Sequence, residues 1–280
     1  MISVTSAQLY AWIAGFIWPL SRILGVISIA PPFSNAMIPT RVKLMLGVFI
    51  AVLISPNVPA LPALDPMSLP GLLVLLQEIL IGLAMGTVMR MTFAAVELAG
   101  QMVSATMGLS FAAFFDPTSE GQTAVISQFF SLLATLIFLS VNGHLVMLAA
   151  LSESFVTLPI SAHPMGTAGI HQLVLWGASL FSMGLQLSLP IIGVLLVTNM
   201  ALGVLSRAAP QLNLFGIGFP VTLSTGFILI ALSLPYMITP LDRLLNNGID
   251  MIKMIGGVAS PYAPAGTLKP AAPAASPAAP

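Results

Sequence analysis

Four ionisable side chains lie inside otherwise apolar stretches of the sequence, where a charge needs a specific partner. They are Arg22, Glu78, Arg90 and Glu97. A charged side chain at the centre of a bilayer costs at least about 2.5 kcal/mol unless it is paired or hydrated. A series of such groups could relay protons, but the seven-residue spacing of Arg90 and Glu97 is about 10 Å along a helix, too far for a simple pair. We favour the interpretation that each charge satisfies a neighbouring subunit or a broken helix end.

The sequence contains no recognisable set of catalytic or metal-binding residues. It has no cysteine, and its histidines are His144, His163 and His171, which excludes thiolate chemistry and makes a poor metal set. The serine-hydrolase pattern GxSxG, the zinc-protease pattern HExxH and the nucleotide-binding pattern GxxxxGK followed by Ser or Thr do not occur. These observations predict a protein that is not an enzyme, carries no cofactor and takes any energy for transport from elsewhere.

The composition is that of an integral membrane protein. Of the 280 residues, 58% are hydrophobic and 6% are charged, against about 25% charged in a soluble domain. Basic and acidic residues balance at eight each, so nothing supports nucleic-acid binding. A membrane-spanning helix needs about 20 mostly apolar residues. Six stretches qualify, near residues 9–30, 44–64, 69–89, 123–151, 172–205 and 214–240. We therefore expect an all-α, polytopic membrane fold of about six hydrophobic segments.

Several segments contain features that interrupt a straight helix. Prolines lie within them at positions 19, 56, 190, 220 and 235, and proline removes a backbone donor and bends or breaks a helix. Segment 90–122 is apolar but carries charges and glycines, which suggests a re-entrant stretch folded into the interior of an assembly. In residues 259–280, 15 of the 22 are Ala or Pro, which predicts a disordered tail.

Small and flexible residues gather in the third segment and just after it. Gly82 and Gly86 form a GxxxG pattern, which lets the backbone of another helix approach closely. Five of the 16 methionines follow between Met85 and Met107. Their flexible thioethers could form a deformable seal around a passing chain, or could simply fill space between helices.

Several motifs along the chain resemble those of one protein family. The most specific is RAAPQLNLFGIGFP at 207–220, and APPFSNAMIPTRVK at 30–43, FAAFFDP at 111–117, NGHL at 142–145 and TLPIS at 157–161 occur in the matching order. Together they resemble the FliR family, the single-copy subunit of the type III export gate, over about residues 5–255. In that family the longest motif joins two C-terminal helices, and its matching residues here are Arg207, Pro210, Gln211, Asn213, Phe215, Gly218, Phe219 and Pro220.

The resemblance implies a function and partners. FliR-like subunits join FliP-like and FliQ-like membrane subunits and an FlhB-like export switch protein in the flagellar basal body of the bacterial inner membrane. Their bent helical hairpins assemble in a helical ring, through which unfolded flagellar proteins are exported for flagellum assembly. The F-x-x-GFP ending of the motif favours the flagellar branch. A gate subunit of a virulence injectisome is the alternative, and a small-molecule secondary transporter is a less favoured one.

The resemblance also implies a division of the chain. Residues 1–165 would form a FliP-like helical hairpin region, residues 166–258 a FliQ-like hairpin, and residues 259–280 the Ala/Pro-rich tail. Segment 104–121 would be a luminal loop that plugs the pore. The plug role falls on Phe111, Phe114, Phe115, Asp116 and Pro117, since large apolar rings exclude water and ions from a narrow pore. The alternative is that these aromatic rings pack inside the subunit and Asp116 begins a turn.

Overall fold

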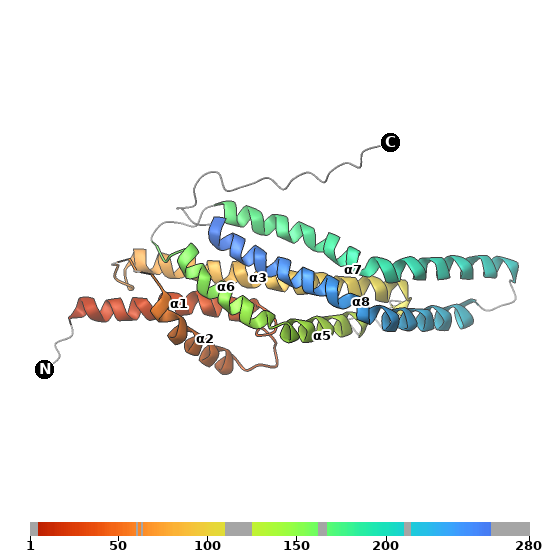
Figure 1. Cartoon of the computed structure of the whole chain (residues 1–280), viewed down its shortest axis with the longest axis horizontal. Coiled ribbons are helices and arrows are strands. Elements are labelled where there is room, and N and C mark those ends of the chain that lie inside the picture. The colour runs from red at the N-terminus through yellow and green to blue at the C-terminus, as the bar shows by residue number, and fades with distance from the viewer. Residues whose placement is uncertain are drawn as a thin grey trace, which may run out of the picture.

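The computed structural model describes residues 5–59, 61–62, 64–109, 125–161, 167–209 and 214–258. The regular elements of this part are all helical (Figure 1). They are α1 (Ser6–Ile29), α2 (Thr40–Ile54), the short 3-10 helix η1 (Ser55–Asn57), α3 (Leu69–Thr106), α5 (Val125–Ser140), α6 (Gly143–Thr157), α7 (Thr167–Ala208) and α8 (Leu214–Val258).

The membrane-protein prediction is confirmed by the length and hydropathy of these helices. Within the described ranges, α1, α2, α3, α7 and α8 are each long and apolar enough to cross a membrane. Helices α5 and α6 would together make a sixth span, with a bend of 69° between them. The bend lies at Asn142, whose φ of 56° falls in the left-handed region that asparagine tolerates better than most residues. The expected all-α fold of bent hairpins is therefore the observed one.

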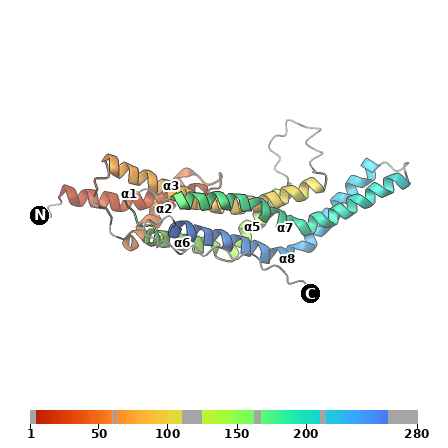
Figure 2. The same cartoon turned by 90° about the horizontal axis from the view of Figure 1, so that it is seen from above.

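Most of the prolines bend helices or sit within them without ending them. Pro19 lies inside α1, Pro190 inside α7, and Pro220 and Pro235 inside α8. Both α7 and α8 change direction about midway along their length (Figure 2). Pro56 is the exception, because α2 ends just before it and the chain continues as η1.

Helix α3 lies at the centre of the molecule and corrects one prediction. It packs against α1 on one side and against α5, α7 and α8 elsewhere, and it runs unbroken through Arg90 to Thr106. Residues 90–106 are therefore a continuation of the third segment rather than a re-entrant stretch, because Val96, Ala99 and Val103 are fully buried between helices. Residues 110–124, where the rest of that prediction falls, lie outside the described part.

The C-terminal helices α7 and α8 form a long antiparallel pair. They lie side by side in both views (Figures 1 and 2). The C-terminal end of α7 and the N-terminal end of α8 extend past the other helices. Each has more than 40 residues, which corresponds to about 60 Å at 1.5 Å per residue. A bilayer core is about 30 Å thick, so one bilayer cannot enclose either helix along its axis.

Candidate functional site

A fully buried ion pair joins the first helix to the central one. Arg22 on α1 donates from Nε to Oε2 of Glu78 on α3 at 2.6 Å, and from Nη2 to Oε1 at 3.1 Å. Both side chains have no exposed surface. Two parallel N–H to oxygen bonds of this kind are the strongest arrangement available to a guanidinium and a carboxylate.

The remaining donors of Arg22 bind the C-terminal end of α6, the second half of the bent α5–α6 pair. Nη1 donates to the backbone oxygen of Ser154 at 2.9 Å and to its hydroxyl at 3.1 Å, and Nη2 donates to the backbone oxygen of Leu158 at 3.0 Å. The guanidinium also lies 4.4 Å from the ring centre of Phe155, within the range of a cation–π contact. All five N–H donors of the guanidinium are thus used, and one side chain fixes α1, α3 and the end of α6 relative to each other.

The helix backbones come closest beside this ion pair. A Cβ atom on Gly25 of α1 would lie 3.0 Å from the Cα of Gly82 on α3, and a Cβ on Gly82 would overlap the backbone carbonyl of Arg22. A Cβ on Gly86 would lie 3.1 Å from the carbonyl oxygen of Val26. The predicted close-packing role of the GxxxG pattern is confirmed, and its partner is α1.

The other two predicted charges do not join this network. Glu97 is half-buried and accepts a hydrogen bond from the hydroxyl of Ser131 on α5 at 3.2 Å, while the hydroxyl of Ser127 donates to its backbone oxygen at 2.9 Å. Arg90 is exposed. Within the described ranges, Arg22 and Glu78 form the only ion pair whose N and O atoms lie closer than 4.0 Å. The four charges therefore form no continuous relay there.

The sequence did not predict the ion pair, but it predicted one of the groups that Arg22 binds. The pair joins residues 56 positions apart, and the expectation of a broken helix end applies to Arg22, because it binds the carbonyl end of α6 within the same chain. One local signal was available. Each charge is followed within one helical turn by a small residue on the same face, Gly25 after Arg22 and Gly82 after Glu78.

The buried methionines act in packing. At most 1% of the surface of Met85, Met89 and Met107 is exposed. These three side chains therefore fill space between helices of the chain. Met91 and Met102 are half-buried.

The family-signature segment lies at the junction of α7 and α8. Arg207 is exposed in the last turn of α7, and α8 begins at Leu214. Gly218 is buried near the start of α8, whereas Phe219 is 43% exposed. Three more of its predicted residues, Pro210, Gln211 and Asn213, lie outside the described part. Phe215 and Pro220 lie in the first turns of α8, and Pro220 is exposed.

The predicted plug lies outside the described residues, but the end of the helix that precedes it, α3, is described. Phe111, Phe114, Phe115, Asp116 and Pro117 all belong to the segment that follows the end of α3. That end receives side chains from both C-terminal helices. Asn199 of α7 donates to the backbone oxygen of Thr106 at 3.4 Å, and Thr222 of α8 donates to that of Met107 at 3.3 Å.

The outer surface of the helices is apolar over most of its length. Large hydrophobic side chains are exposed on α1, α2, α7 and α8, among them Trp12 (64%), Met45 (71%), Phe181 (66%), Val197 (66%) and Leu232 (65%). In the part of the chain that the structure describes, His, Cys, Asp and Glu side chains form no group of three or more that could hold a metal ion. The functional features of the described part are thus a buried polar clamp and an extended apolar exterior.

Comparison with known proteins identifies the family. The family model for bacterial export proteins, family 1, matches residues 13–248. The flagellar biosynthetic protein FliR of Pectobacterium carotovorum subsp. carotovorum is 42% identical over 252 residues, which cover 90% of this chain and 96% of that protein. FliR of Escherichia coli (strain K12) is 43% identical over the same length and shares, and FliR of Bacillus subtilis (strain 168) is 27% identical over 243 residues, 85% of this chain and 93% of that protein. The chain therefore belongs to the FliR family of bacterial flagellar export proteins.

Proposed function

We propose that this chain is a non-enzymatic subunit of the flagellar type III protein export gate. In this role it joins FliP-like and FliQ-like subunits and an FlhB-like switch protein in the bacterial inner membrane, at the flagellar basal body. Unfolded flagellar proteins pass through the resulting channel, and the flagellum cannot assemble without it. Family membership supports the export role, and the named relatives are flagellar rather than injectisome proteins.

The observation that carries this proposal is the length of the exposed apolar surface. Side chains such as Val174 near one end of α7 and Val204 near the other are 64% and 70% exposed, and they lie 30 residues apart, about 45 Å along the helix. The whole of α7 is about twice as long as a bilayer core is thick. Apolar surface that extends beyond lipid must be covered by other protein, as it is when this chain is one part of a ring of subunits.

The division of the chain belongs to the same proposal. Residues 1–165 form the FliP-like region and residues 166–258 the FliQ-like hairpin, with the Ala/Pro-rich residues 259–280 outside both. The proposed boundary is supported by its position between α6, which ends at Thr157, and α7, which begins at Thr167. Helix α3 packs against both regions, so the two would share one core.

The test is the composition of the complex in which the chain resides. We expect a tagged copy, purified in mild detergent from cells that express the neighbouring membrane proteins, to emerge with FliP-like and FliQ-like subunits in a complex of fixed mass by native mass spectrometry. A tagged membrane protein of similar size and unrelated function serves as the control. Recovery of the chain alone, or only as copies of itself, would contradict the proposal.

A further inference from the structure

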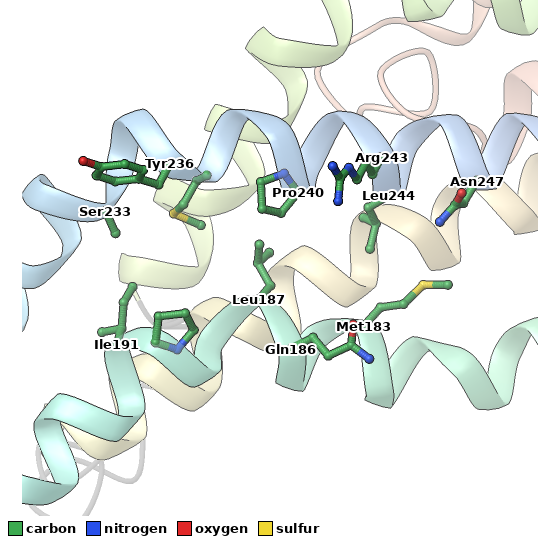
Figure 3. Close-up of a pocket in the computed structure, with 12 residues that line it drawn as sticks. Met183, Gln186, Leu187, Ile191, Ser233, Tyr236, Pro240, Arg243, Leu244 and Asn247 are labelled. Atoms are coloured by element: carbon green, nitrogen blue, oxygen red, sulfur yellow. The ribbon is translucent and has the colours of Figure 1, made fainter. Parts of the chain in front are cut away.

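A groove opens between α7 and α8 where both helices bend. Its volume is about 580 Å³, and it is lined from α7 by Met183, Gln186, Leu187, Pro190 and Ile191, and from α8 by Ser233, Tyr236, Met237, Pro240, Arg243, Leu244 and Asn247 (Figure 3). A volume in this range, about 300–1,000 Å³, is typical of sites that bind small molecules.

Polar and apolar side chains both line the groove. Figure 3 shows Arg243 and Asn247 on α8 and Gln186 on the facing α7, with Leu187 between the two helices and Ile191, Ser233 and Tyr236 toward the other end. The amide nitrogen of Gln186 donates to the hydroxyl of Ser182 on its own helix at 3.1 Å. Arg243 carries a permanent positive charge and Asn247 carries amide N–H donors. The groove therefore offers a cation and an amide to an anionic head group, and apolar side chains to a hydrocarbon chain.

The charges of α8 place this groove at the boundary between an uncharged and a charged part of the helix. Residues 214–241 contain no Asp, Glu, Lys, Arg or His, whereas Asp242, Arg243, Asp250 and Lys253 follow within the next dozen residues. Within the described ranges, Arg243 forms no ion pair closer than 4.0 Å. The groove thus begins beside an unpaired cation and runs into the uncharged half of the helix, as a lipid runs from its head group into the hydrocarbon layer.

We propose that this groove binds a membrane phospholipid with an anionic head group. The guanidinium of Arg243 and the amide of Asn247 bind the phosphate, since the planar donor fork of arginine matches phosphate geometry. One acyl chain lies along Leu187 and Ile191. Basic pockets between membrane helices bind anionic head groups in the same way. The binding site lies within one chain and does not depend on the gate proposal.

The charge of the groove favours a lipid as the occupant. Arg243 lies where the uncharged run of α8 ends, which suits a phosphate head group. An extended acyl chain is thin enough to follow Leu187 and Ile191 along the groove.

Photo-crosslinking identifies the occupant directly. Tyr236 lies on the rim and is 81% exposed, so it can be replaced by photoreactive benzoylphenylalanine in the full chain in its native membrane. We expect irradiation of membranes to add the mass of a phospholipid to the chain. An adduct with a polypeptide would overturn the proposal, because a partner protein would then occupy the groove.

The head-group contact is tested by counting the lipid retained. The full chain, with any subunits that stay bound to it, is purified in neutral detergent, incubated with phosphatidylglycerol or phosphatidylcholine, and analysed by native mass spectrometry. We expect Arg243→Gln to reduce retained phosphatidylglycerol at least fivefold, Arg243→Lys to keep most of it, and Arg207→Gln, which changes an exposed arginine at the end of α7, to leave it unchanged. Equal retention by the wild type and Arg243→Gln, or equal retention of the two lipids, would overturn the proposal.

Discussion

At the scale of single residues, Arg22 joins three helices within the chain, whereas each of the four charges was expected to satisfy a neighbouring subunit or a broken helix end. It has a bidentate carboxylate partner, two backbone carbonyl partners and an aromatic ring beneath it. A buried charge with every donor satisfied holds its neighbours in one geometry, because any shift leaves a donor unpaired in an apolar interior. Arg22 is therefore a structural clamp for three helices.

Removing one partner of this ion pair should destabilise the chain strongly. We expect Glu78→Gln to lower the stability by about 3–5 kcal/mol, because Arg22 would remain buried without a counter-charge. The double variant Arg22→Met with Glu78→Met should recover part of the loss, since two apolar side chains need no partner, while the backbone oxygen of Leu158 loses the donor that Arg22 supplies. The midpoint of thermal unfolding in detergent measures both effects.

The exposed Arg207→Gln provides the matched control for that series and should unfold at the wild-type temperature. A Glu78→Gln variant as stable as the wild type would show that the ion pair is not a clamp.

The aromatic residues of the proposed plug make a second prediction at this scale. We expect Phe114→Gly with Phe115→Gly to let ions pass through the resting gate, because two large apolar rings no longer exclude water from the pore. The conductance of the complex in planar bilayers measures the leak. Phe219→Gly, an exposed aromatic residue on α8, is the control. A fully assembled double variant that stays sealed would count against the plug.

At the scale of elements, the crossing of α1 and α3 depends on the absence of side chains. Gly82 and Gly25 face each other where the backbones meet, and the ion pair lies one turn away. The close approach shortens the distance that Arg22 must span to reach Glu78 and the end of α6. Packing at the glycines and the polar clamp therefore support each other.

A methyl group at this crossing should separate the helices. We expect Gly82→Ala to destabilise the chain by about 1–3 kcal/mol through overpacking, because the added Cβ would overlap the backbone of Arg22. Gly193→Ala is the matched control, since a Cβ at that helical position meets nothing within 4 Å. Thermal unfolding midpoints of the two variants compare them. Equal midpoints would refute the role of the close approach.

The sequence could predict the features of this crossing that are local. Apolar runs identified the helices, and the spacing of Gly82 and Gly86 identified a close contact, because both signals lie within one segment. The partner of Glu78 could not be found, since the relative position of two helices is set by packing between distant segments. Helix α3 was predicted too short because Arg90 and Glu97 suggested an interruption. In the fold, Arg90 is exposed and Glu97 meets a serine hydroxyl, so neither breaks the helix.

At the scale of the whole molecule, the apolar exterior links the fold to the proposed gate. Among the described residues, five helices are long and apolar enough to cross a membrane, yet the bent α7–α8 pair extends past the rest (Figure 1). This surface fits the proposal that the chain is one part of an export channel, in which Arg22 and Glu78 hold α1, α3 and α6 together and neighbouring subunits cover the exposed faces of α7 and α8.

The export of flagellar proteins by a strain that lacks this chain tests the central claim most directly. The measurement is the amount of hook and filament protein in the culture medium, with insertion of an unrelated membrane protein as the control. We predict that deletion abolishes export and motility, that a plasmid copy restores both, and that the control protein inserts normally. Normal export and motility in the deletion strain would contradict the account.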